Sequence, residues 1–245
     1  MKKTLKQFAL LPLFCGLLLT VACNKNDDKD VEIPNSWFNG VITAVVENGS
    51  NYDELFEKVV VTVWDRMAGN SEKIASGNWY NGGFALTLPS TLDNNFLENF
   101  GDLEHYMDGI QVSDKNANFT NDTPIFWAYD NEGNRVGGRF KLSKEDQNSY
   151  TEVLFMYADR DVRVIGSQKE ISDEGEEYIE IWNVSLKKGW NKVYATQHEN
   201  RGEISTQAVS DMNWYFENWS DFLGIQKAPK NLPKRNTVFP RIGRK

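Results

Sequence analysis

Hydrophobic positions recur in short runs along the chain from residue 59 onward, and most runs have the two-residue period of β-strands. Residues 59–64 are rich in β-branched side chains, and residues 83–88 and 178–186 alternate between apolar and polar or small side chains. This pattern is typical of strands with one buried face. The same criteria predict strands at residues 125–129, 135–142, 153–157, 162–165, 190–194, 204–209 and 214–216.

Polar turn residues separate these strands. Residues 130–134 and 187–189 contain Gly, Asn, Asp and Lys, and the first of these segments predicts a hairpin. Helical spacing of apolar residues is confined to residues 91–100 and 217–223, where we expect short helices. The sequence therefore predicts an all-β fold, an antiparallel β-sandwich with one or two short helices.

The β body extends over residues 36–225. We expect either one sandwich or two sandwich-like halves, divided at residues 36–116 and 117–225. Roughly 200 residues are compatible with either arrangement.

The first 22 residues follow the pattern of a secretory signal peptide. Lysines at positions 2, 3 and 6 precede an apolar stretch that extends to residue 22. This stretch fits the apolar region of a signal peptide, about 7–15 residues, better than a membrane-spanning helix of about 20 residues.

Residues 20–23, Thr-Val-Ala-Cys, resemble the lipobox of bacterial lipoproteins, although Thr20 stands where that family usually has Leu. In that family the cysteine thiol receives a diacylglyceryl group and the preceding peptide bond is cut. The resemblance thus implies a lipid on Cys23, which anchors the protein in a membrane. Cys15 lies in the discarded peptide, so the mature chain has no disulfide. The alternative is an ordinary signal peptide followed by an unmodified cysteine.

Three further stretches resemble surface lipoproteins of Bacteroides and related bacteria. Residues 23–35 begin with Cys23 and form an acid-rich tether similar to the export signal of those proteins. Residues 80–89 and 185–194 resemble turns and strand edges that recur in that group. The resemblance implies display on the outer face of the outer membrane and an all-β body, and it implies no particular activity.

Charge excludes one class of partner. The chain has a formal net charge of −8, and loss of the first 22 residues with their three lysines leaves −11. A body this acidic is not expected to bind nucleic acid. Residues 226–245 are an exception, because they carry only basic charges. This tail is interpreted as a frayed terminus, with docking on an acidic surface as the alternative.

Catalytic motifs are absent from the sequence. His105 and His198 have no second histidine at metal-ligand spacing, and no phosphate loop, dinucleotide fingerprint or nucleophile elbow is present. Residues 130–134 and 173–177 are acidic, but we expect turns there rather than Ca²⁺ loops. The sequence predicts no cofactor and no metal, and it singles out no carboxylate pair of the kind that glycosidases use.

Aromatic residues are the remaining candidates for a binding site. Sugars stack on Trp and Tyr rings while planar polar side chains bind their hydroxyl groups. Two clusters combine rings with amides or carboxylates, and the alternative for both is a place in the core. The candidate ligand-binding residues are Trp79, Tyr80, Trp214, Tyr215 and Trp219.

The leading hypothesis is a non-enzymatic lipoprotein of the outer membrane that binds a ligand, such as a glycan, or serves as a structural accessory. One alternative is a carboxylate-dependent surface hydrolase. Another is an adhesin or assembly subunit that docks to a second envelope protein through the tail or an edge strand.

We predict that Cys23→Ala releases the protein from the membrane fraction and abolishes its labelling by a radioactive lipid precursor, because the thiol is the acceptor of the lipid. Cys15→Ala is the control and should leave both properties unchanged. Membrane attachment and labelling that survive Cys23→Ala would show that the anchor is elsewhere.

Overall fold

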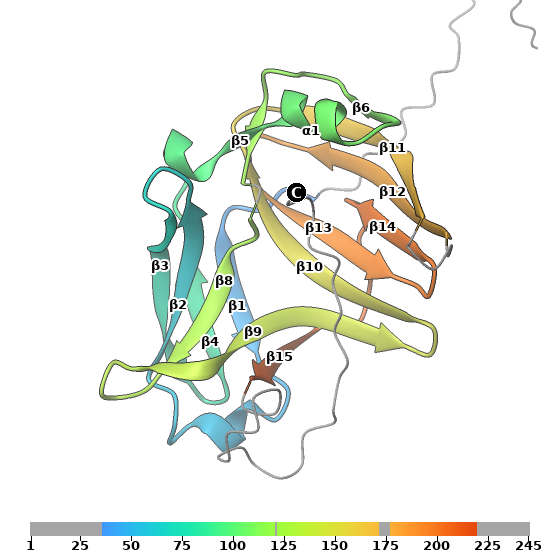
Figure 1. Ribbon diagram of the computed structural model, residues 1–245. Helices are drawn as coiled ribbons and strands as arrows, with labels where there is room; N and C mark the ends of the chain where they lie inside the picture. Colours follow the sequence, from blue (N-terminus) through green and yellow to red (C-terminus); the bar gives the residue numbers. More distant parts are fainter. Residues whose placement is uncertain (1–35, 121, 172–176, 220–245) are drawn as a thin grey trace, which may run out of the picture. The chain divides into compact units, whose positions relative to one another are not determined.

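A computed structural model describes residues 36–120, 122–171 and 177–219 (Figure 1). The described residues belong to one compact unit. The predicted signal peptide, Cys23, the tether and the basic tail lie outside the described residues. Within the described ranges, no helix has both the length and the apolar character needed to span a bilayer.

The described chain is built mainly of strands. The elements in order are β1 (Val41–Val45), η1 (Gly49–Tyr52), β2 (Lys58–Asp65), β3 (Asn70–Tyr80), β4 (Gly83–Thr87), η2 (Asn94–Phe96), β5 (Glu98–Asn99), α1 (Phe100–Tyr106), β6 (Ile110–Val112), β7 (Asn118–Phe119), β8 (Ile125–Tyr129), β9 (Arg135–Asp146), β10 (Ser149–Ala158), β11 (Val162–Ile171), β12 (Glu177–Leu186), β13 (Gly189–Gln197), β14 (Arg201–Ser205) and β15 (Asn213–Asn218). Every strand range predicted from the sequence overlaps one of these strands. The prediction of an all-β fold is confirmed.

The strands of the described ranges belong to one 15-stranded sheet with the order β1-β4-β3-β2-β8-β9-β10-β13-β14-β12-β11-β6. Strand β15 pairs with β9, and β7 joins β5 to β10. All pairings between these strands are antiparallel except that of β12 with β14. The sheet is not flat: β1 begins the path, yet Val46, just after β1, forms a bridge with Trp214 of β15, which pairs with β9 in the middle of the path.

Strand β9 joins the two parts of this sheet because it changes partners along its length. Its first half pairs with β8, where Phe140 lies opposite Phe126. Its second half pairs on the same edge with β10, where Ser143 lies opposite Glu152. Its other edge pairs with β15 from Gly138 to Ser143.

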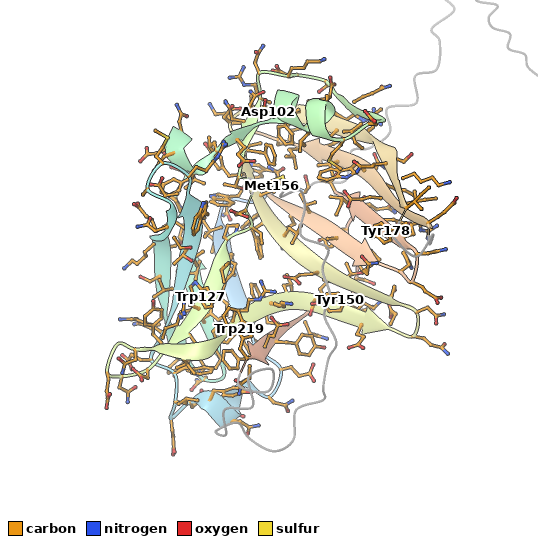
Figure 2. The ribbon with its side chains drawn as sticks, in the orientation of Figure 1. Asp102, Trp127, Tyr150, Met156, Tyr178 and Trp219 are labelled. Atoms are coloured by element: carbon orange, nitrogen blue, oxygen red, sulfur yellow. The ribbon has the colours of Figure 1, made fainter. Side chains whose placement is uncertain are left out.

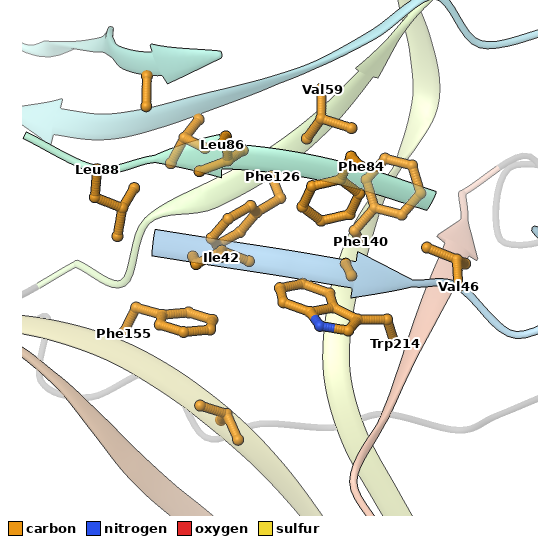
Figure 3. Packing of buried hydrophobic residues seen from close by; sticks show 14 of the residues in the cluster. Ile42, Val46, Val59, Phe84, Leu86, Leu88, Phe126, Phe140, Phe155 and Trp214 are labelled. Carbon is orange, nitrogen blue, oxygen red and sulfur yellow. The ribbon is translucent and has the colours of Figure 1, made fainter. Parts of the chain in front are cut away.

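Two hydrophobic cores lie on opposite faces of β10 and β13. Alternation along β10 sends Phe155 into the first core and Met156 into the second. Figure 3 shows Phe84 and Phe126 of the first core, with Phe155 and Trp214 below them. Strands buried on both faces have continuous apolar sequences. This explains the run at residues 153–158.

The predicted division at residues 116 and 117 does not separate the two cores. Phe100 and Val112 precede that boundary but pack in the second core. Phe126, Phe140 and Trp214 follow it but pack in the first core. The boundary is therefore corrected: the two parts of the sheet exchange segments and do not form successive halves of the chain.

The helix predicted at residues 91–100 is also corrected. That segment contains the short 3₁₀ helix η2 and strand β5, and helix α1 begins only at Phe100. Asn95 donates a side-chain hydrogen bond to Asp65, and its carbonyl accepts from the backbone N–H of Arg66. These bonds tie the segment to the end of β2, so the tertiary contacts outweigh its weak helical spacing. Of the helix predicted at residues 217–223, the first two residues are in β15 and residues 220–223 lie outside the described ranges.

We predict that Phe140→Ala lowers the free energy of unfolding by about 3–5 kcal/mol, the usual cost of removing a buried Phe side chain. Phe140 is buried and its ring lies within 5.3 Å of the rings of Trp79, Phe84 and Phe216. Urea denaturation of residues 24–245 measures the change. Met67→Ala, at an exposed position, should alter stability by no more than about 0.5 kcal/mol. Equal effects of the two variants would contradict the described core.

Candidate functional site

The outer face of β9 carries polar side chains opposite the core. Phe140 and Leu142 point toward the first core, so alternation turns Arg139, Lys141 and Ser143 to the opposite face, where neighbouring residues bury Lys141 and Ser143. On β15, Glu217 lies opposite Arg139, and Tyr215 lies opposite Lys141. We call this outward surface, with its neighbours on β8, β10 and β15, the β9 face.

Four charged side chains form an ion-paired cluster on the β9 face. Lys141 Nζ lies 2.9 Å from Glu217 Oε1 and 3.2 Å from Glu152 Oε2. Arg139 Nε donates to Glu217 Oε2 at 2.8 Å. The Lys141 side chain is only 4 % exposed and that of Glu217 18 %. Two cations and two carboxylates thus balance each other away from bulk water, the arrangement in which buried charges are tolerated.

Aromatic side chains flank this charge cluster. The Tyr150 hydroxyl donates to Glu152 Oε2 at 3.2 Å. At the other end of the face, the Trp219 ring packs edge-to-face on Trp127 at 5.1 Å, and the Arg135 guanidinium lies 4.4 Å from the centroid of Trp127. Figure 2 shows Trp127, Trp219 and Tyr150 along the course of β9. Tyr150, Tyr215 and Trp219 are partly exposed.

A small pocket lies where β8 and β10 separate along the edge of β9. Lys141 and Leu142 fall between the last residue that pairs with β8 and the first that pairs with β10. The side chains around this gap include Thr123, Ile125, Lys141, Leu142, Glu152 and Trp214. The pocket therefore extends from the charge cluster toward the first core.

Ionisation of the cluster is set by its contacts. Burial alone would raise the pKa of Glu217, but hydrogen bonds from Lys141 and Arg139, together with their charges, outweigh burial and lower that pKa to about 2. Burial, followed by the charge of Glu152, raises the pKa of Tyr150 above its ordinary value. At neutral pH, Glu217 is therefore ionised and Tyr150 keeps its proton. A carboxyl group with the pKa of Glu217 has no proton to donate as a general acid.

The structure separates the residues that the sequence suggested for ligand binding. Trp79 and Trp214 are buried in the first core, so their predicted stacking role is corrected: core side chains cover their rings. Tyr215 and Trp219 lie on the β9 face. Tyr80 is 74 % exposed, but it lies at the β3–β4 hairpin, and the structure does not bring it together with the other two.

Several residues of the β9 face were not identified from the sequence. Arg139, Lys141, Glu152 and Tyr150 carry no motif, and a Lys between two apolar residues is an ordinary feature of a half-exposed strand. Alternation within residues 214–219 was the one available signal, because it places Tyr215, Glu217 and Trp219 on the face opposite Trp214. The partners that bury Lys141 come from β10 and β15, and only the fold reveals them.

Metal ligands do not gather in the described residues. No group of three or more His, Cys, Asp and Glu side chains there is placed to hold a metal ion. Residues 130–134 form the β8–β9 turn, in which Asp130 Oδ1 accepts the backbone N–H groups of Glu132 and Asn134. Residues 173–176 of the second acidic run lie outside the described ranges.

Comparison with known proteins adds no assignment, because no family model, curated protein or solved structure matches the chain.

We predict that Glu217→Gln lowers the free energy of unfolding at about pH 7 by roughly 2–3 kcal/mol, because Lys141 and Arg139 lose a charged partner. The pKa of Glu217 is lowered from 4.5 to about 2 in the folded protein. The stabilisation is therefore present above about pH 4.5 and is lost as the pH falls toward 2. Urea denaturation across this range should show the two proteins converging in acid.

Glu203→Gln is the matched control. Glu203 pairs with Arg201 at 3.0 Å, but both side chains are exposed, and such pairs contribute about 0–1 kcal/mol. If the difference between wild type and Glu217→Gln stayed constant down to pH 2, the ion pairs of Glu217 would not be its cause.

Proposed function

We propose that the chain is a lipoprotein of the outer membrane, anchored through Cys23, whose β body is a non-enzymatic binding accessory with a carbohydrate ligand on the β9 face. The anchor and the location rest on the signal peptide, the lipobox-like residues 20–23 and the acidic tether. The observation that supports the ligand is the row of partly exposed rings, Tyr150, Tyr215 and Trp219, beside the charge cluster.

The balanced charges of the cluster favour an uncharged polar ligand. Arg139 and Lys141 are already paired with Glu217 and Glu152. An ionic ligand would have to displace one of these partners and leave a buried charge unpaired, which is costly. Sugar hydroxyl groups need no such displacement, because carboxylate oxygens have lone pairs beyond those that the cations use. Rings beside such acceptors fit the apolar face of a sugar.

The lowered pKa of Glu217 favours binding over hydrolysis. A glycosidase needs one protonated carboxyl group and one ionised carboxylate. Lys141 and Arg139 hold Glu217 in its ionised form, so Glu217 cannot serve as the protonated partner. The cluster therefore supports a binding accessory rather than the carboxylate-dependent hydrolase.

The test is binding of residues 24–245 to an array of bacterial and host polysaccharides, followed by titration of each ligand with tryptophan fluorescence as the readout. We expect Trp219→Ala to weaken binding up to about tenfold, because an aromatic contact contributes about 0.5–1.5 kcal/mol. Tyr215→Ala should also weaken binding. Thermal unfolding of both variants shows whether the fold is retained.

Tyr80→Ala is the matched control, since it removes an exposed ring from a different surface. It should leave affinity unchanged. Loss of binding with Tyr80→Ala alone would move the site to the β3–β4 hairpin. No binding to any polysaccharide, with unchanged fluorescence, would refute the carbohydrate ligand.

A further inference from the structure

The surface formed by β1, β4 and the end of β3 has no charged side chain. Residues 36–46 and 74–92 contain no Asp, Glu, Lys or Arg, in a chain whose net charge is −8. On the outer side of this surface, Val45 is 80 % exposed and Val41 50 %. Thr43 is exposed between these two valines on β1. On the neighbouring strand β4, Ala85 and Thr87 are exposed beside them. An exposed uncharged surface of this kind marks an interaction site.

Strand β1 also presents unpaired backbone groups. Leu88 donates to the carbonyl of Gly40, and Val46 donates to the carbonyl of Gly82, both at 2.9 Å. The even-numbered residues of β1 therefore bond to β4, and the odd-numbered residues direct their N–H and C=O groups away from it. Within the described ranges, no strand pairs with that edge from Val41 to Val45.

Natural edge strands are usually protected. Charged side chains, prolines and β-bulges are the common devices, because an open edge is a template for pairing with another chain. The segment Val41–Val45 has none of these devices. At one end of the edge, the Asn39 Oδ1 accepts the N–H of Val41 at 3.1 Å, and a carbonyl from another strand can replace that acceptor. At the other end, just after β1, the N–H of Glu47 donates to the carbonyl of Trp214 in β15 at 2.8 Å.

The exposed residues of β1 are symmetric about Thr43. The order Val41, Thr43, Val45 reads the same in both directions. Antiparallel pairing of two copies places Thr43 opposite Thr43 of the second copy and Val41 opposite its Val45. The outward groups of these residues would then exchange about four hydrogen bonds, because the bridge between Val46 and Trp214 already engages the Val45 carbonyl. Both kinds of cross-strand pair are favourable.

We propose that β1 pairs with β1 of a second copy, antiparallel about Thr43, and that the sheet thereby continues through a symmetric dimer. A second copy fits this edge because an uncharged surface lets two copies of an acidic protein approach without like-charge repulsion. The contact is isologous: each copy contributes the same strand, as in most closed dimers. This dimer is independent of carbohydrate binding, because its residues do not belong to the β9 face.

The test uses opposite charges at the centre of symmetry. Light scattering coupled to gel filtration at micromolar concentration measures the mass of residues 24–245. We expect a dimer for the wild type and a monomer for both Thr43→Lys and Thr43→Glu, because like charges then face each other. An equimolar mixture of the two variants should restore the dimer, since each ammonium group then lies opposite a carboxylate.

Thr87→Lys is the matched control, because Thr87 is exposed on the same surface but lies one strand away from the edge. It should remain dimeric. Circular dichroism checks that each variant folds. A monomeric wild type would overturn the proposal, and so would a mixture of the two Thr43 variants that stays monomeric. A dimer lost with Thr87→Lys but retained with both Thr43 variants would overturn the edge pairing as well.

Discussion

The partner change of β9 is the constraint on which the rest of the described structure depends. A strand that pairs first with β8 and then with β10 on one edge must bend where the two partners separate, at Lys141 and Leu142. The bend lets the sheet fold back, so that β10 and β13 are covered by a core on each face. Without this strand, the first core would lose Phe140, Val136 and Leu142.

The charge cluster lies at this bend for a physical reason. The gap between β8 and β10 leaves space along the edge of β9 that neither strand fills. The Lys141 side chain lies at this gap, paired with Glu152 of β10 and Glu217 of β15. The same contacts specify how β15 aligns with β9. A shift of β15 by one residue would bury Glu217 among aromatic rings and expose Phe216, so the ion pairs and the core favour the same register.

Alternation in the sequence predicts more of this structure than motifs do. It places most of the longer strands, but the sequence offered the buried Trp79 and the exposed Tyr80 alike as candidate binding residues. It fails where long-range contacts decide the outcome. Hydrogen bonds between Asn95 and the end of β2 prevent the helix predicted at residues 91–100. Burial of Lys141 depends on partners from β10 and β15, which a local pattern cannot reveal. Strands β1, β3, β5, β6 and β7 were not predicted. Strand β3 is mostly polar and exposed, so it has no clear apolar alternation.

The two candidate surfaces differ in which polar groups they leave without a partner: side-chain oxygen lone pairs on the β9 face, and backbone N–H and C=O groups at the β1 edge. This difference suggests distinct roles. On the β9 face, cations and carboxylates satisfy each other, so a ligand gains most from ring contacts and from the remaining lone pairs of oxygen atoms. At the β1 edge, side chains are uncharged while the backbone N–H and C=O groups point outward without a described strand to pair with. Such groups are satisfied best by another strand, because only a strand presents donors and acceptors at the matching spacing. One surface is therefore suited to a small polar ligand and the other to a protein chain.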